Sequence, residues 1–240
     1  FIKGIPVDFD GIGEKIHSGR NEVRVVKTQG ITLAIKFFKK LTFINRIVYA
    51  SLRVPKANRS YLNSKHLIAN GITSPSPVAF LNIYNHGILR KSYYVSVYTS
   101  YKSLKELLEL PIAESEEGLK AFARFTYRLH SKGILHDDFT ISNILYVQVN
   151  GNYDFSLIDN NRMRFRRYSY SRGVKNLERL KVPVEKMGII AAEYAHEAHV
   201  SELRMLNAMT FFRIRYTVKL SAKKWFKTTY IDLLKQYYFV

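Results

Sequence analysis

Three oxygen-bearing side chains lie at the ends of two short predicted strands in the middle of this 240-residue chain. The strands are predicted over residues 144–149 and 155–158, and an Asn-Gly turn between them predicts a hairpin. Asp138 and Asn143 stand in the loop before the first strand, and Asp159 follows the second. Such a hairpin gathers three hard oxygen ligands, which Mg²⁺ prefers and usually shares with water and substrate phosphates. Each residue taken alone is typical of a turn, but the joint arrangement predicts a metal site.

The order of the other predicted elements indicates an α+β protein with two lobes. Strands and one helix are expected first, at 22–27, 31–38, 56–70 (the helix), 78–84 and 92–98, and helices then predominate, at 103–110, 115–131 and from about 175 onward. Strands followed by helices are typical of α+β folds. The change near Tyr98–Tyr101 predicts a β-rich N-terminal lobe, residues 1–98, and a mainly helical C-terminal lobe, residues 99–240.

The charge of the chain predicts an anionic partner. Lysine and arginine number 38 against 19 aspartates and glutamates, a net charge of +19. Such an excess suits a nucleotide, a phosphorylated substrate, a nucleic acid or an anionic membrane. The chain has no cysteine, which excludes disulfides, zinc–thiolate sites and thiol catalysis. No apolar run approaches the ~18 residues of a transmembrane helix.

The spacing of the polar residues resembles that of protein kinases. His136 and Asp138 form a His-x-Asp pair, Asn143 follows five residues after the aspartate, and Asp159 comes after a strand pair. Kinases use these positions for the catalytic base and the metal ligands. They also use a strand lysine to hold nucleotide phosphates, and Lys36 lies within a predicted strand about a hundred residues upstream.

A turn just before the expected strand at 22–27 contains Gly19, Arg20 and Asn21. Its backbone N–H groups would cover the phosphates, and Arg20 would add a positive charge. The turn has one glycine rather than a glycine series, so a plain surface turn is an alternative interpretation.

Longer runs resemble the lipopolysaccharide kinase family, which comprises Kdo kinases and core heptose kinases. The similar runs are GRNEVRVV with GITLAIKFFKK, NRSYLNSKHLIANGITSPSPVAF, HDDFTISNIL and LIDNNRMRF, so the resemblance spans roughly Gly19 to Phe165. It implies a two-lobed protein-kinase-like fold. It also implies transfer of a phosphoryl group from ATP, with Mg²⁺, to a sugar hydroxyl of the lipopolysaccharide inner core.

The resemblance also assigns roles to the candidate residues. Asp138 would be the catalytic base, Asn143 and Asp159 the Mg²⁺ ligands, and Lys36 the phosphate anchor. Asp-Asn-Asn at 159–161 replaces the Asp-Phe-Gly of protein kinases, so control by that phenylalanine is not implied.

One departure concerns the partner of Lys36. Protein kinases pair their strand lysine with a helix glutamate, but residues 23–105 contain no acidic side chain at all. The pair is therefore absent, or is supplied by Glu22, Asp159 or a residue outside the first lobe. An absent pair would indicate a weakened or inactive kinase.

Two basic segments predict contacts with anionic surfaces. The first interleaves cations with apolar residues and is typical of a membrane-surface helix or a site for a phosphate-rich saccharide; its cations are Lys39, Lys40, Arg46, Arg53, Lys56 and Arg59. The second follows Asp159, where a kinase holds its acceptor, and contains Arg162, Arg164, Arg166, Arg167 and Arg172. The alternative for the first segment is a helix packed on the small lobe with a solvated basic face, and the alternative for the second is nonspecific surface charge. Electrostatic docking on the cytoplasmic face of the inner membrane is the expected localisation.

Two other functions fit parts of the sequence. An atypical bacterial protein kinase would also be basic, but no Ala-Pro-Glu-like motif stands between Asp159 and Pro183. A nucleic-acid-binding module would explain the charge and the tyrosines, but it leaves the Asp138, Asn143 and Asp159 set unexplained. We therefore expect no nucleic-acid partner.

Overall fold

The structure is a computed structural model that describes residues 1–39 and 54–238. The centre of the first basic segment, with Lys40, Arg46 and Arg53, lies outside the described residues. The chain packs as two compact units: a first unit of residues 1–106 with 142–164, and a second unit of residues 107–141 with 165–240. This division by packing assigns the 144–157 hairpin to the same unit as the N-terminal sheet. The lobe boundary expected near residues 98–101 stays a prediction.

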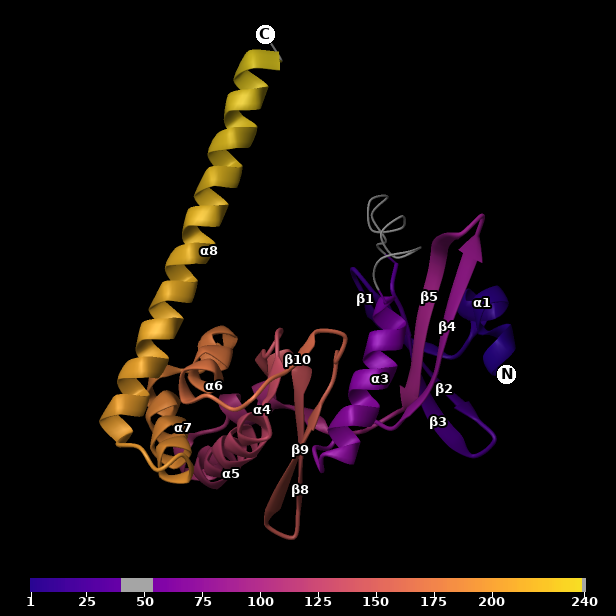
Figure 1. The fold of residues 1–240 in the computed structure, drawn as a ribbon. Helices are drawn as coiled ribbons and strands as arrows, with labels where there is room; N and C mark the ends of the chain where they lie inside the picture. Colours follow the sequence, from indigo (N-terminus) through magenta and orange to yellow (C-terminus); the bar gives the residue numbers. More distant parts are fainter. Residues whose placement is uncertain (40–53, 239–240) are drawn as a thin grey trace. The chain divides into compact units, whose positions relative to one another are not determined.

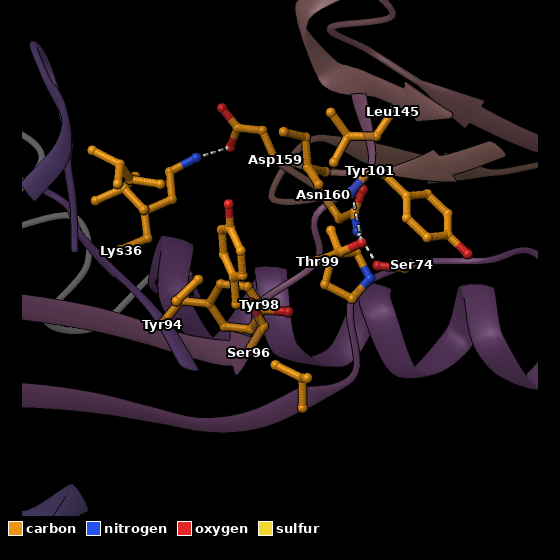
Figure 2. Close-up of a pocket in the computed structure, with 16 residues that line it drawn as sticks. Lys36, Ser74, Tyr94, Ser96, Tyr98, Thr99, Tyr101, Leu145, Asp159 and Asn160 are labelled. Atoms are coloured by element: carbon orange, nitrogen blue, oxygen red, sulfur yellow. Dashed lines mark hydrogen bonds and ion pairs between the residues drawn. The ribbon is translucent and has the colours of Figure 1, made fainter. Parts of the chain in front are cut away.

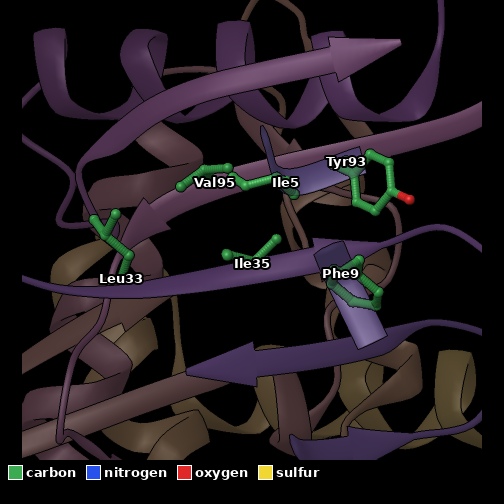
Figure 3. Packing of buried hydrophobic residues seen from close by; sticks show 6 residues of the cluster. All are labelled: Ile5, Phe9, Leu33, Ile35, Tyr93 and Val95. Carbon is green, nitrogen blue, oxygen red and sulfur yellow. The ribbon is translucent and has the colours of Figure 1, made fainter. Parts of the chain in front are cut away.

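An antiparallel five-stranded sheet forms the first unit, with strand order β1-β2-β3-β5-β4 (Figure 1). Its strands are β1 (Glu14–Ser18), β2 (Glu22–Thr28), β3 (Ile31–Phe37), β4 (Pro77–Asn85) and β5 (Ile88–Val97). The N-terminal turns η1 (Ile2–Gly4), α1 (Ile5–Asp8) and η2 (Phe9–Gly11) precede it. Their apolar residues join the sheet in one core, with Ile5, Phe9, Leu33, Ile35, Tyr93 and Val95 buried together (Figure 3). Leu33 and Ile35 of β3 face this core, so Lys36 lies on the opposite face of the sheet.

Helix α3 (Lys56–Ala69) packs against β4 and β5. It ends as the sequence predicts, because Gly71 has a left-handed φ of 68° and the Ile72 N–H bonds back to the Leu67 carbonyl at 3.0 Å. The helix thus presents one fixed face to the sheet, and that face carries the buried Ser60, Ser64 and Leu67.

A small sheet completes the first unit, with strand order β6-β8-β9. Its strands are β6 (Lys102–Ser103), β8 (Ile144–Val149) and β9 (Asn152–Leu157). The turn η3 (Ile141–Asn143) leads into β8, and β10 (Met163–Phe165) follows the hairpin. The predicted hairpin is confirmed, and Ile144 pairs with Leu157 at its end.

The second unit is mainly helical. It contains the second half of α4 (Leu104–Glu109), then α5 (Ile112–Ser131), β7 (Ile134–His136), α6 (Tyr170–Asn176), η4 (Leu177–Arg179), α7 (Val184–Glu197) and α8 (Glu202–Tyr238). Helix α5 begins at Ile112, three residues before the predicted start at Ser115. Pro111 provides the N-terminal cap, and the Ser115 hydroxyl donates back to the Pro111 carbonyl at 2.9 Å instead of capping. A β-rich first part and a mainly helical remainder confirm the α+β class.

No helix in the described part of the chain is both long and apolar enough to cross a membrane.

Candidate active site

A cavity of about 310 Å³ opens beside the sheet of the first unit (Figure 2). Its walls come from β1, β2, β3 and β5, from the segment after β5, and from both ends of the 144–157 hairpin. The lining includes Val23, Ala34, Lys36, Tyr94, Leu145 and Asp159. A mostly apolar cavity of this size with few charged groups is typical of a small-molecule site. The apolar walls suit a flat base, and the Lys36 side suits phosphate.

Lys36 and Asp159 form an ion pair in this cavity. The Lys36 Nζ lies 2.7 Å from the Asp159 Oδ1, and the two side chains are 17% and 24% exposed. Both strands that flank β3 hold the lysine in place, because it pairs with Val23 on β2 and Tyr94 on β5. Asp159 has a left-handed φ of 58°, which asparagine and aspartate tolerate better than most residues. This conformation directs the carboxylate to the lysine, so the structure brings two predicted site residues together.

The structure also identifies which acid partners Lys36 in the described chain. Glu22 is 3% exposed, and it binds Arg24 at 2.8 Å and Lys39 instead. Its hydrogen bonds with Lys39 and then Arg24 lower the pKa of this carboxyl below its usual value. Asp159 therefore supplies the pair that a helix glutamate makes in protein kinases, one of the alternatives left open by the sequence.

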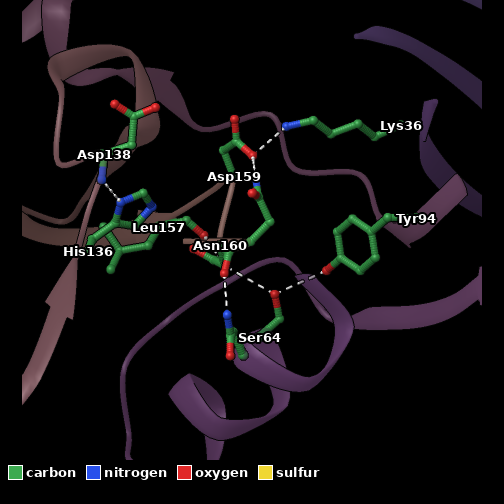
Figure 4. A network of polar contacts seen from close by, with 10 residues as sticks. Lys36, Ser64, Tyr94, His136, Asp138, Leu157, Asp159 and Asn160 are labelled. Atoms are coloured by element: carbon green, nitrogen blue, oxygen red, sulfur yellow. Dashed lines mark hydrogen bonds and ion pairs between the residues drawn. The ribbon is translucent and has the colours of Figure 1, made fainter. Parts of the chain in front are cut away.

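Helix α3 is linked to the Asp159 segment by a neutral hydrogen-bond network (Figure 4). The Asn160 amide is buried and donates to the hydroxyls of Ser64 at 3.0 Å and Ser74 at 2.9 Å. Asn63 of α3 donates to the Asn160 carbonyl at 2.6 Å, and the Tyr94 hydroxyl donates to Ser64 at 3.1 Å. Neutral hydrogen bonds thus connect α3 to Asn160, the residue after Asp159. Protein kinases connect the corresponding helix to the site through an ion pair between a glutamate and the strand lysine.

The sequence interpretation did not assign Asn160 or Ser64 to this network. Asn160 was noted only as a departure from Asp-Phe-Gly, and Ser64 only as part of a helix. The available signal was the polar face of α3, where Ser60 and Ser64 recur at four-residue spacing without an acid.

Replacing Asn160 with leucine keeps the branched shape of the side chain, makes it somewhat larger and removes the donated hydrogen bonds. It also removes the buried Asn160 Oδ1, which has no hydrogen-bond partner among the described residues. These effects offset each other, so we expect the free energy of unfolding, measured by urea titration, to change by only about 1 kcal/mol. We expect kcat to fall about tenfold, because Asp159 loses its fixed neighbour. The control is Asn82→Leu, which breaks a bond to Asn58 of the same helix and should leave kcat unchanged. A normal kcat in Asn160→Leu would show that the network only stabilises the fold.

Asn143 stands beside Asp159 at the end of the hairpin. The Asn143 carbonyl accepts the N–H of Ile158 at 3.0 Å, so the backbone holds both predicted ligands next to each other. Among the described residues, no group of three or more histidine, aspartate or glutamate side chains could hold a metal ion. One amide and one carboxylate nevertheless fit Mg²⁺, which keeps several waters and binds through one or two protein ligands plus phosphates.

Asp138 belongs to the second unit, where Arg179 holds it. The Arg179 guanidinium lies 2.6 Å from the Asp138 Oδ1 and donates to the Asp137 carbonyl at 2.6 Å. The Asp138 N–H donates to His136 Nδ1 at 3.0 Å, so the backbone on its N-terminal side is also fixed. Asp138 is a half-exposed carboxylate in a rigid loop, which is the arrangement that a general base needs. Arg179 was missed from the sequence because it lies 41 residues away.

Buried His130 supports the loop that carries Asp138 through the side chain of Asn176. The Asn176 side chain accepts the His136 N–H at 3.2 Å and donates to the His136 carbonyl at 2.8 Å. His130 lies 3.2 Å from the same amide oxygen and 3.0 Å from the Tyr194 hydroxyl. A neutral ring with its proton on Nε2 satisfies both contacts. Burial lowers the pKa of His130 to about 4, although its bond to Asn176 acts in the opposite direction.

His130 should therefore make the protein sensitive to mild acid. The unfolded histidine binds a proton near pH 6.5 and the folded one only near pH 4, so stability falls as the pH falls through that window. We expect the free energy of unfolding to drop by about 2 kcal/mol between about pH 7 and pH 5. Urea titrations should show that His130→Gln loses this contribution and that exposed His196→Gln keeps it. Equal pH dependence of wild type and His130→Gln would refute this explanation.

The remaining predicted site residues have separate positions. Gly19, Arg20 and Asn21 form the turn between β1 and β2, where the Gly19 N–H bonds to the Asn21 carbonyl at 2.9 Å, but none of these three described residues lines the cavity. The four arginines after Asp159 are all exposed; Arg162 and Arg164 belong to the first unit, and Arg166 and Arg167 to the second. Their roles stay predictions.

A second lysine accompanies Lys36. The Nζ atoms of Lys36 and Lys56 lie 5.5 Å and 5.8 Å from the centre of the Phe38 ring. Burial lowers the pKa of Lys56, and nearby Arg162 and Arg59 lower it further. The sequence interpretation placed Lys56 only in the basic segment, but the structure places it beside the same Phe38 ring as Lys36.

Comparison with known proteins supports a kinase assignment. The model of the "Lipopolysaccharide kinase (Kdo/WaaP) family" matches residues 21–199. The solved structure "WaaP in complex with acyl carrier protein" has a TM-score of 0.60 at 14% identity, over 89% of this chain and 90% of that chain. A MAP kinase, LmaMPK10 from Leishmania major, has a TM-score of 0.42 at 16% identity, over 86% of this chain and 65% of that chain. No curated protein matches the sequence significantly. The similarity to WaaP confirms the protein-kinase-like fold.

Proposed function

The chain belongs to the lipopolysaccharide kinase (Kdo/WaaP) family and is a phosphotransferase, and we propose that it phosphorylates a sugar hydroxyl of the lipopolysaccharide inner core, on Kdo or heptose, with ATP. The observation that carries the proposal is the Lys36–Asp159 pair in a nucleotide-sized cavity. A strand lysine and the aspartate that follows a hairpin are the parts with which kinases hold nucleotide phosphates and metal.

Four side chains would bind the nucleotide. Lys36 supplies positive charge to the phosphates, and Asn143 and Asp159 supply oxygen ligands. Mg²⁺ held by Asn143 and Asp159 would neutralise charge on the transferred phosphoryl group. In the structure, Asp159 accepts from both Lys36 and Asn161, so the carboxylate is held before any ligand binds. Lys56 adds a second cation beside Phe38.

Asp138 would act on the acceptor. Its carboxylate takes the proton of the sugar hydroxyl as the oxygen–phosphorus bond forms and the bond to the ADP oxygen breaks. Arg179 orients the carboxylate through its ion pair. Because Arg179 also binds the Asp137 carbonyl, it fixes the loop as well as the side chain.

The acceptor is expected to bring negative charge. Exposed Arg162, Arg164, Arg166 and Arg167 follow Asp159, and arginine forks suit the phosphates and carboxylates of lipopolysaccharide. Such an acceptor is lipid-linked, so we also propose that the protein works on the cytoplasmic face of an anionic inner membrane, where ATP is present.

The test combines binding with transfer. Thermal shift with ATP and Mg²⁺ should stabilise the protein, because a ligand that binds only the folded state raises its stability. Labelled phosphate should then move from ATP to purified lipopolysaccharide. Transfer to protein substrates but not to saccharide would favour a protein kinase, and no transfer to either would refute the proposal.

A further inference from the structure

The last helix of the second unit leaves the rest of that unit after about half its length. Its first part packs on α6, α7 and η4 and buries Met205 and Met209. From residue 217 to residue 230 the side chains are exposed, with only Thr229 half-buried. The ribbon of this part of α8 extends away from α6 and α7 (Figure 1). Helices in proteins gain most of their stability from packing of an apolar face, so a helix with this much exposed apolar surface is expected to have an external partner.

An apolar stripe of exposed side chains runs along α8 from residue 211 to residue 225. Phe211, Ile214, Val218 and Trp225 are 59%, 59%, 62% and 62% exposed. Their spacing of three, four and seven residues puts them on one face of the helix, and Phe226, 65% exposed, lies at its edge. Large apolar side chains gathered on one exposed face mark an interaction surface.

The opposite face is basic. Lys219, Lys223 and Lys227 recur every four residues and, at 100° per residue, point away from the stripe. No aspartate or glutamate occurs anywhere in residues 203–231. A long helix with aromatic residues on one face and lysines on the other is typical of helices that lie in a membrane interface.

We propose that residues 211–230 of α8 dock on an anionic phospholipid surface, with the apolar stripe in the boundary between headgroups and acyl chains. The positive charge of this segment favours a lipid surface over a second copy of the chain. A second copy of the chain would bring a second set of lysines and arginines to the same stripe with no acid in this segment to offset them. A lipid surface supplies both acyl chains for the stripe and negative charge for the lysines.

The docking helix is connected to the candidate catalytic loop through Arg179. The Tyr216 hydroxyl accepts from Arg179 Nε at 3.2 Å, and Arg179 pairs with Asp138. Docking would therefore attach the unit that carries the proposed base to the surface that holds the lipid-linked acceptor. This consequence rests on the proposed function, whereas the docking itself rests only on α8.

Trp225 is the only tryptophan of the chain, so its fluorescence reports directly on the stripe. The full chain is mixed with vesicles of phosphatidylcholine alone, or of phosphatidylcholine with phosphatidylglycerol, and both emission and co-sedimentation are measured. We expect a blue shift and co-sedimentation with the anionic vesicles. Both should be largely lost in about 1 M salt, where the Debye length is about 3 Å. Unchanged emission with both vesicle types would overturn the proposal.

Charge-reversal variants then locate the surface. Lys219→Glu, Lys223→Glu and Lys227→Glu together should weaken binding to anionic vesicles about 100-fold, because each lysine contributes about 1 kcal/mol. The matched control reverses three exposed lysines elsewhere, Lys15, Lys27 and Lys132, and should bind nearly as wild type. Circular dichroism confirms that each variant is folded. Equal losses in both triple variants would indicate only general charge and would refute a specific role for α8.

The other basic segment is tested in the same assay. If reversal of Lys39, Lys40 and Arg46 abolishes binding while the α8 variant binds normally, that segment is the docking surface and the proposal for α8 is wrong. A concentration-dependent dimer that hides Trp225 without lipid would also overturn it, in favour of a second copy. If the emission of Trp225 shifts to the blue only with an acidic protein and not with vesicles, the lipid proposal is wrong and a protein partner is indicated.

A soluble acceptor separates docking from catalysis. Transfer of phosphate to delipidated core saccharide should be unchanged in the α8 triple variant. Normal transfer without vesicle binding in the wild type would refute docking and leave the kinase function intact. Vesicle binding without phosphate transfer would refute the kinase function and leave the docking of α8 intact.

Discussion

Asp138→Asn is expected to lower kcat for phosphate transfer about 1000-fold and to leave ATP binding nearly unchanged. An amide cannot accept the proton of the acceptor hydroxyl, and general bases contribute roughly 10²- to 10⁴-fold. Lys36, Asn143 and Asp159 are untouched by this change. The measurement is single-turnover transfer to lipopolysaccharide, alongside thermal shift with ATP and Mg²⁺.

The adjacent Asp137→Asn is the matched control for this variant. It removes the same charge one residue away and retains the backbone carbonyl to which Arg179 donates. It should keep most of the activity. If Asp138→Asn keeps near-normal turnover, or if Asp137→Asn is equally inactive, Asp138 is not the base.

Lys36→Met is expected to lower kcat/KM about 100- to 1000-fold and to weaken nucleotide binding. Methionine keeps much of the length of the side chain but removes the cation that pairs with Asp159 at 2.7 Å. Loss of one preorganised group that stabilises developing charge costs this much in other enzymes. Initial rates over a range of ATP concentrations would separate kcat from KM.

The control for this variant is Lys27→Met, on the exposed side of β2. It removes an equal charge outside the cavity and should leave both constants unchanged. If Lys36→Met remains fully active and binds ATP normally, the phosphate anchor is another cation. Lys56 is then the candidate, because it lies on the same Phe38 ring.

Much of the candidate site could be predicted from the sequence because its spacing is local. Asp138 and Asn143 stand in one loop, and a two-strand hairpin delivers Asp159 next to Asn143. Lys36 was recognisable because strand alternation and its surrounding apolar residues place it on a sheet. The helix over 56–69 and its end at Gly71 also follow from local rules.

The partners of these residues could not be predicted, because each depends on which distant side chains fold to the same place. Two acids could pair with Lys36, and only the arrangement of Lys39 and Arg24 around Glu22 leaves Asp159 for it. Asn160 meets Ser64 across 96 residues. No local pattern encodes such contacts.

The α+β class, the catalytic-loop pattern and the charge of +19 can be read from the amino-acid sequence, because they depend on spacing and composition. Tertiary structure alone decided that Arg179 pairs with Asp138 and that Phe211 and Trp225 of α8 remain exposed. An amphipathic pattern shows that a face exists but not whether the protein itself covers it. In α8 the packing against α6 and α7 ends where the exposed apolar stripe continues, and only the fold could reveal that.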